Sequence, residues 1–449
     1  MATRSFIGAG ANIRQTYSIT MAGTGDWVAA DTITSTVANI AFVTTVGSLV
    51  TDAQVATTVF QALSGATLTD TTASATIGAG DVGATAIPQF GTSEFNATNP
   101  SAGVVLLTGG PASPSPAWLA GKPFTIAITE NTTGDETATG AAVVTPTSQA
   151  HWDQPDNWSG NTVPVDSDVI AFDTGNVDLL YALTTAIQPL TVNKSKQYTG
   201  NVGLAYINVD NPAKPYAEYR TPLYLTFDDN SITTTLNLET GTGQGSSRFM
   251  VDNGAGQAVV NVLGKGSRKD LGTPCILWKG THAANIVRNI AGDIGIAFYA
   301  GETAVVATLT TGDSSTSQAE TVCGSGVTLT TVTLNGGKQE TSSAITTAVQ
   351  NGGNWTHLLG TVTALTINAG TYYPNGAATH TTITVRTGGK LDCRKGTASF
   401  TVTNPIQLFK GAEINDPNGR MGNFAFVLNG CNLEDVTIIT PYGKTFTIS

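Results

Sequence analysis

Short runs of alternating apolar and polar residues, separated by glycine turns, dominate the chain beyond about residue 200. The clearest stretch, Gly326 to Gly411, contains the segments GVTLTTVTLNGG, AITTAVQNGG, ALTINAG, TTITVRTGG and PIQLFKGAEI. Its turn glycines recur roughly every 16 to 23 residues, the length of one coil of a β-solenoid. They are Gly336, Gly352, Gly370, Gly388 and Gly411. A single coil cannot bury its narrow apolar face, so coils stack and share one interior.

The first 150 residues have a different pattern. Apolar residues alternate in TYSITMAG, DTITSTVANIAFVTTVG, GVVLLTGG and FTIAITE, which predicts strands. Between them, TDAQVATTVFQALSG predicts one helix over about residues 52–64, with Thr51 or Asp52 as its cap. Its apolar residues Val55, Val59, Phe60 and Leu63 fall on one face. The Thr/Ala/Gly-rich stretch from Leu68 to Gly83 predicts a long loop.

These patterns predict a mainly β protein with three regions. Residues 1–150 form a small α+β or β-sandwich-like module that serves as an assembly anchor. Residues 151–165 form a linker or cap that contains two tryptophans, and residues 166–449 form a parallel β-helix. Such a rod serves as a scaffold, a spike or a spacer, and any chemistry on it would have to be added as a site.

Composition narrows the function classes. Only 12% of residues are charged, against about 25% in typical proteins. The net charge of −11 argues against nucleic acid as a partner, because phosphate binding needs clustered Lys and Arg. No stretch approaches the roughly 20 apolar residues that cross a bilayer. The N-terminal sequence MATRSFIGAGANIRQ has no apolar signal-peptide core. We therefore expect synthesis in a host cytoplasm without export, and no membrane partner.

The second region begins at His151 and runs through HWDQPDNWSGNTVP into the predicted strand VIAFD. This entry segment resembles that of bacterial and phage surface β-solenoid proteins. The later phrases LWKGTHAANIV, IGIAFYAGE, GSGVTLTTVTLNGG and AEINDPNGR resemble those of phage-encoded β-solenoid virion proteins. The resemblance covers most of the chain and rests on the general residue pattern and on short phrases. It implies a structural protein of a virus particle.

Trp152 and Trp158 have two interpretations. The first coil of a solenoid exposes an open apolar end that a capping element must cover, and two large flat indoles are suited to that role. The alternative is that both indoles are exposed and stack on a glycan. We favour the cap.

Candidate catalytic residues are few. Glycoside hydrolysis needs two carboxylates at a separation of about 5 to 10 Å. The best candidates are Asp228 and Asp229, with Glu239, Asp252, Asp293 and Glu302 in nearby coils. Adjacent residues on a strand point to opposite faces, however. Because Asn230 follows, a turn is the more natural interpretation, and we predict no catalytic residue.

Metal and cofactor motifs are also missing from the sequence. His151, His282, His357 and His380 have no paired spacing typical of a metal or nucleophile site. The four cysteines match no ligand spacing, and we expect reduced, buried thiols. They are Cys275, Cys323, Cys393 and Cys431. We predict no metal and no cofactor.

Two function classes remain open. The first is a non-enzymatic virion protein, which we expect to be a capsid decoration protein at the virion surface that contacts the major capsid protein or other virion proteins. The alternative is a tail fibre or tailspike that binds, and less readily cleaves, host surface glycans. We also expect a homotrimer, because flat Thr/Val-rich faces with little charge aggregate when left uncovered.

Overall fold

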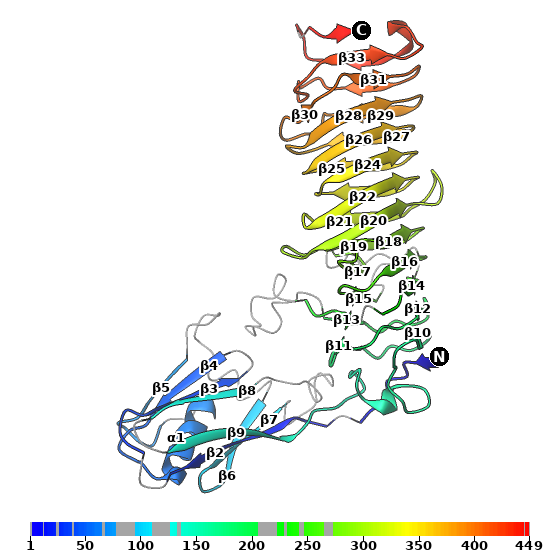
Figure 1. The fold of residues 1–449 in the computed structure, drawn as a ribbon. Coiled ribbons are helices and arrows are strands. Elements are labelled where there is room, and N and C mark those ends of the chain that lie inside the picture. Colours follow the sequence, from blue (N-terminus) through cyan, green and yellow to red (C-terminus); the bar gives the residue numbers. More distant parts are fainter. Residues whose placement is uncertain are drawn as a thin grey trace.

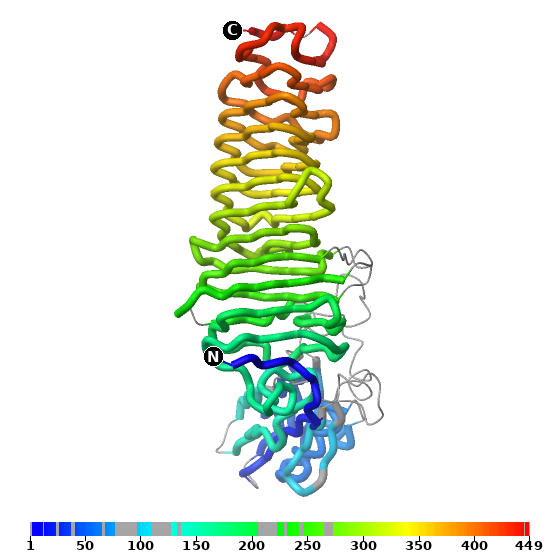
Figure 2. The backbone as a smooth tube through the Cα atoms, turned by 90° about the vertical axis from the view of Figure 1, so that its right-hand side faces the viewer, coloured from blue at the N-terminus to red at the C-terminus, as the bar shows by residue number. Residues whose placement is uncertain are grey.

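The computed structural model describes residues 2–11, 13–23, 27–37, 40–64, 68–77, 95–109, 126–132, 136–204, 222–228, 231–241, 247–264, 273–443 and 445–448. Its main body is a rod of stacked coils, and a smaller N-terminal module projects from the base of the rod (Figure 1). Figure 2 shows the coils one above another from the base to the C-terminal end.

The rod consists of two long sheets in which all strand pairs are parallel. Strands of the two sheets alternate along most of the chain, so one coil contributes a strand to each. The 15-stranded sheet contains β1 (Thr3–Ser5), β10 (Val169–Phe172), β12 (Thr191–Lys194), β14 (Thr234–Leu238), β16 (Ala258–Val262), β18 (Ile286–Asn289), β20 (Ala304–Thr311), β22 (Val327–Leu334), β24 (Ile345–Gln350), β26 (Thr361–Ile367), β28 (Thr379–Val385), β30 (Thr401–Val402), β31 (Ile406–Leu408), β33 (Ala425–Leu428) and β35 (Thr447–Ile448). The 12-stranded sheet contains β11 (Thr184–Thr185), β13 (Leu225–Phe227), β15 (Phe249–Asp252), β17 (Ile276–Lys279), β19 (Asp293–Ile296), β21 (Glu320–Cys323), β23 (Lys338–Thr341), β25 (Asn354–His357), β27 (Gly370–Pro374), β29 (Gly389–Asp392), β32 (Glu413–Asn415) and β34 (Thr437–Ile439).

Side-chain ladders hold the coils in register. The Asn351 amide donates to Oδ1 of Asn335, 16 residues earlier, at 2.9 Å. Asn368 donates to Asn351, 17 residues earlier, at 2.8 Å. A second ladder at the base joins Asn193, Asn237 and Asn261, whose amide contacts are each 3.0 Å. The parallel β-helix predicted from the glycine spacing is confirmed.

Alternation along each strand builds the interior. In the 15-stranded sheet, Val287, Leu309 and Val332 pair in register and are fully buried. Val332 continues this column through Ala348 to Leu365 on the following strands. Because one residue in two points inward, each coil adds a layer to one continuous apolar core.

Two of the predicted turn glycines lie one residue before the glycine with positive φ. Positive φ values occur at Gly337 and Gly353, the second members of the pairs that begin with Gly336 and Gly352. At Gly370, Gly388 and Gly411 the predicted glycine itself has positive φ. The predicted coil period is therefore correct. Where two glycines are adjacent, the sequence alone did not show which of them has the positive φ.

The N-terminal module packs two antiparallel four-stranded sheets and one helix around a shared core. The helix α1 spans Asp52–Ser64, as predicted. Thr51 and Gln54 cap it reciprocally: the Gln54 amide donates to Thr51 Oγ1, and the Thr51 amide donates to Gln54 Oε1. One sheet contains β6 (Phe95–Ser101), β7 (Val104–Gly109), β2 (Thr16–Ala22) and β9 (Thr137–Val144), and the other contains β5 (Ser74–Ile77), β4 (Ile40–Thr45), β3 (Thr32–Val37) and β8 (Ile126–Asn131).

Two details differ from the sequence prediction. The stretch predicted as a loop from Leu68 contains the edge strand β5. The first strand of the chain, β1, pairs in parallel with β10 and so belongs to the solenoid rather than to the N-terminal module. The chain therefore starts in the rod, leaves it to build the module, and returns to it.

Candidate functional site

The cap segment closes the base of the rod with aromatic side chains. A 3-10 turn at Pro155–Asn157 holds it, and the Asn157 amide donates to the carbonyl oxygens of Ser148 and His151 at 2.8 and 2.7 Å. The Trp158 indole nitrogen donates to the carbonyl oxygen of Trp152 at 2.7 Å, and the two rings lie edge to face at 4.7 Å.

Both indoles are removed from solvent. Trp152 is 3% exposed and Trp158 is 0% exposed. Phe6, which follows β1, packs against Trp158 at 5.3 Å and against Phe172 of β10 at 5.7 Å. Stacking on a glycan requires an exposed ring face, so the exposed-indole alternative does not agree with this burial.

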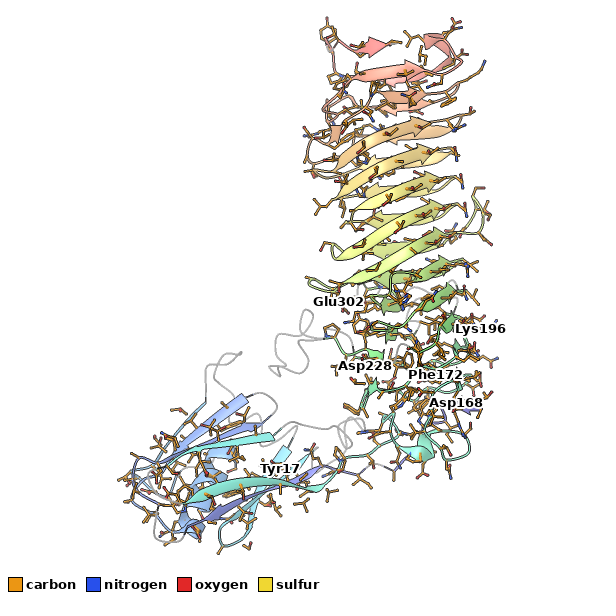
Figure 3. All side chains as sticks on the ribbon, viewed as in Figure 1. Tyr17, Asp168, Phe172, Lys196, Asp228 and Glu302 are labelled. Atoms are coloured by element: carbon orange, nitrogen blue, oxygen red, sulfur yellow. The ribbon has the colours of Figure 1, made fainter. Side chains whose placement is uncertain are left out.

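The structure describes one member of the candidate carboxylate pair, Asp228. Asp228 is exposed directly after β13, and its backbone amide donates to Thr185 at 2.9 Å. Asp229 lies outside the described residues. Figure 3 places Asp228 and Glu302 on the side of the rod from which the N-terminal module projects, whereas Asp168 and Lys196 lie on the other side.

The fold brings two other acidic residues together around a lysine. The Lys279 amine lies 3.4 Å from Asp252 Oδ2 and 3.8 Å from Glu302 Oε1. The Tyr224 hydroxyl donates to Glu302 Oε2 at 3.1 Å, and the lysine amine lies 4.5 Å from the tyrosine ring centroid. Burial, reinforced by Glu302, raises the pKa of Tyr224 well above its ordinary value.

This cluster is better suited to structure than to catalysis. Lys279 occupies the space between the two carboxylates, where the reacting bond of a substrate would have to lie. Tyr224 also belongs to a small apolar cluster with Met250 and Leu277, against which Phe298 and Tyr299 pack. The ion pair with Lys279 and the hydrogen bond from Tyr224 join the loop that carries Glu302 to the 12-stranded sheet.

A polar groove lies farther along the same sheet. It combines a depression of about 410 Å³ with a neighbouring one of about 230 Å³, and the two share Glu320, Lys338 and Asn354. One end is lined by residues of the loop before β21, and the other by Tyr373 and Lys395. The Lys395 amine lies 4.2 Å from the Tyr373 ring centroid.

The shape of this groove follows from coil length. The turns at Gly337 and Gly353 stack so closely that a Cβ atom at Gly353 would overlap the carbonyl oxygen of Gly337. The coils there are 16 and 17 residues long, and the loop that contains Ser315 and Ser317 overhangs them. The groove offers many hydrogen-bonding groups and little apolar surface, which suits a polar ligand such as a saccharide better than an apolar one.

The buried Lys194 was not among the residues predicted from the sequence to be special. Its amine lies inside the first coils and donates to the carbonyl oxygens of Ser195, Tyr198 and Glu239 at 3.2 to 3.4 Å. Burial lowers its pKa to about 8, although Cys275 and Glu239 act in the opposite direction. The strand TVNK places this lysine at an inward position, and alternation alone could have flagged it.

The histidines and cysteines occupy structural positions. His357 and His380 lie inside the rod, where Thr341 Oγ1 bonds Nδ1 of His357 and the Tyr372 hydroxyl bonds Nε2 of His380, both at 2.8 Å. The four cysteines form no disulfide; Cys431 is half-buried and the others are buried. Among the described residues, no three His, Cys, Asp or Glu side chains group as metal ligands.

Comparison with known proteins adds no relative. No protein-family model, curated protein sequence or solved structure matches this chain. In the described part of the chain, no helix has the length and apolar character needed to span a bilayer.

Proposed function

We propose that this protein is a non-enzymatic structural protein of a virus surface, made in the host cytoplasm and mounted on the capsid as a decoration protein. The N-terminal module would bind the major capsid protein, and the solenoid would extend from it. The observation that carries this proposal is the double connection between module and rod. The chain leaves the rod after β1 and returns through the cap segment at His151.

The two connecting segments are joined to each other. Ile13 and Thr147 pair through reciprocal backbone hydrogen bonds of 2.7 and 3.1 Å. At the base of the rod, the Gly10 amide donates to Asn157 Oδ1 at 2.6 Å. A module held by two paired segments keeps its orientation on the rod better than one on a single linker, because bending at the junction must break the hydrogen bonds between the segments. This arrangement suits an anchor that carries a rigid projection.

Attachment to a shell would be multivalent. One small module has limited area for binding, but modules of copies that are joined to one another bind a lattice with greater avidity and without any deep pocket. Rods that stand on such anchors would present the same outer faces many times over the particle.

Immunogold labelling tests the location. Antibodies raised against the solenoid are applied to intact particles of the virus that encodes this chain, with particles lacking the gene as the control. The proposal predicts gold over the whole head surface. Gold confined to the tail tip would contradict capsid decoration and favour a tail fibre.

The polar groove supports glycan binding as a second candidate function. Glu320, Lys338 and Asn354 form its shared floor, and Tyr373 provides an aromatic group at one end. If a host polysaccharide binds there, Tyr373→Ala weakens its binding to the full chain, measured by calorimetry. Tyr442→Ala, at a fully exposed tyrosine near the C-terminal end, is the matched control. Equal binding by both variants and the unmodified chain would remove the groove as the site.

A further inference from the structure

Charge is distributed unequally between the two faces of the rod. The strands β20, β22, β24, β26 and β28 contain no Asp, Glu, Lys or Arg at all. On the opposite sheet, β19 to β29 carry outward charges that include Asp293, Glu320, Lys338 and Lys390. The outer side of β20–β28 is here called the neutral face.

Two columns of small uncharged side chains run along the neutral face in strict register. Thr308 pairs with Thr331, Thr331 with Thr347, Thr347 with Ala364, and Ala364 with Thr382. Two residues along each strand, the second column runs through Thr310, Thr333, Val349, Thr366 and Thr384. Each step along a column equals the spacing between strands, about 4.8 Å.

An exposed protein surface of this kind is unusual. A soluble surface commonly contains about 25–35% charged residues, which keep copies apart. This chain carries a net charge of −11 and places none of its charge on the neutral face. Toward the base, β12 to β18 extend the same surface with the Asn193–Asn261 ladder, and Arg288 is their only outward charge.

We propose that the neutral face is a self-association surface that packs against the same face of a second copy of this chain. A row of side chains with a fixed repeat fits best against a row with the same repeat, and the same chain supplies it. Two acidic molecules repel each other through their charged faces. They approach at least cost where neither carries charge. A basic or acidic partner protein would instead select the charged sheet.

The available area is sufficient for a stable pair. The neutral face and its extension down to β12 comprise nine strands, about 4.8 Å apart and on average about 20 Å long, which together cover roughly 800 Å². A standard interface buries about 800 Å² on each partner. The columns of threonine methyl groups and β-branched side chains supply apolar contact, and the threonine hydroxyls supply hydrogen bonds.

The symmetry that follows is two-fold. A closed three-fold ring needs two different complementary surfaces on each chain, whereas a two-fold pair uses one surface twice. The neutral face is one self-matching surface, so it favours a dimer over the homotrimer expected from sequence. If the two rods also point the same way, both N-terminal modules meet the shell together; this last point rests on the proposed capsid attachment.

Analytical ultracentrifugation of the full chain at micromolar concentration tests the pairing. The unmodified chain should sediment as twice the 46.1 kDa monomer. Thr347→Lys places two like charges in the pair, so we expect its dissociation constant to rise by at least about tenfold. Thr356→Lys, on β25 of the opposite sheet, changes net charge equally and should leave the dimer intact.

Ala364→Glu on β26 is a second substitution on the neutral face, with the opposite charge. Circular dichroism and thermal unfolding establish that each variant is folded. Pairing through this face requires that both neutral-face variants dissociate. A monomeric unmodified chain, a mass three times that of the monomer, or a dimer unaffected by Thr347→Lys and Ala364→Glu would each overturn the proposal. Because the isolated chain is measured, these outcomes do not depend on whether it decorates a capsid.

Discussion

Glycine is required at the inner turns of the rod because successive turns touch through backbone atoms. Gly353 has φ of +68° and Gly370 has φ of +83°. A Cβ atom at either position would overlap the carbonyl oxygen of the glycine in the preceding coil, Gly337 or Gly353. The close spacing of the coils therefore depends on the missing side chain as well as on the backbone conformation.

Substitution of Gly353 by alanine should destabilise the rod more than substitution of Gly388. Gly388 has a similar φ of +81° but no atom within 4 Å of its hypothetical Cβ, so Gly388→Ala carries backbone strain alone. We expect Gly388→Ala to cost about 1 kcal/mol and Gly353→Ala at least about 2–3 kcal/mol, because it adds steric overlap. Urea unfolding of both variants measures the difference. If both variants lose the same free energy of unfolding, the close contact between coils at Gly353 adds nothing to the effect of the substitution.

Histidine burial adds a dependence on pH. Burial lowers the pKa of His357 to about 4 and that of His380 to about 3, with the neighbouring His357 adding to the second effect. In the unfolded chain both have pKa values near 6.5. Below about pH 6.5 these histidines bind protons in the unfolded state but not in the folded state. Their contribution to the free energy of unfolding is therefore fully present above about pH 6.5 and is lost as the pH is lowered.

Between pH 7 and pH 5, above the range of most carboxylates, the free energy of unfolding should fall. Each of these two histidines contributes up to about 1.4 kcal/mol per pH unit below its unfolded pKa. His380→Gln should remove one such contribution and flatten the slope, whatever it does to stability at pH 7. His282→Gln, at an exposed turn, is the control and should keep the full slope. An unchanged slope in His380→Gln would contradict this account.

Among the elements, β1 has an importance out of proportion to its three residues. It pairs with β10, covers the first edge of the 15-stranded sheet, and inserts Phe6 into the aromatic cluster of the cap. The Ala2 amide donates to Asp168 Oδ1 at 2.7 Å, and Arg4 Nε lies 3.5 Å from Oδ2 of the same carboxylate. An uncovered parallel edge would be a template for aggregation.

Truncation of Phe6 should loosen this end of the rod. Phe6 is 3% exposed and Ile7 is 52% exposed, so Phe6→Ala removes buried aromatic contacts while Ile7→Ala removes few. We expect Phe6→Ala to lower the free energy of unfolding by about 3–5 kcal/mol, and Ile7→Ala to lower it by less than about 1 kcal/mol. Hydrogen exchange of β10 and β12 is the measurement. Equal protection in both variants would show that β1 does not hold the cap.

The elements that could be predicted from the sequence are those whose signals lie within a few neighbouring residues. The coil period follows from turn glycines and alternation, and α1 follows from its cap and apolar face, because both signals lie within a few residues. The position of β1 could not be predicted, since Thr3 pairs with Val169 across the whole module. The strand β5 lay in a Thr/Ala-rich stretch whose pattern is too weak to separate an edge strand from a loop.

The same limit applies to the candidate site. Asp252, Lys279 and Glu302 belong to three different coils: the first two end the paired strands β15 and β17, and Glu302 lies in the loop after β19. The groove beside Lys338 likewise depends on the short coils that follow a longer one. Side-chain alternation predicts which residues point outward, but it does not predict which residue of the next coil each will meet.

For the whole molecule, the two sheets form a rod with one neutral and one charged face, and a doubly connected module lies at its base (Figure 1). The base is closed by β1 and the buried indoles of Trp152 and Trp158. The proposed roles follow this division: the module as the anchor, the neutral face as the pairing surface, and the charged face with its groove as the side presented to solvent.

Counting copies of this chain in purified particles tests the proposed capsid role most directly. Quantitative mass spectrometry with isotope-labelled peptides would give the ratio of this chain to the major capsid protein. Decoration of the shell predicts on the order of hundreds of copies per particle, as multivalent attachment to a repeating lattice requires. A count of about six to eighteen, as closed symmetric tail assemblies carry, would contradict the capsid role.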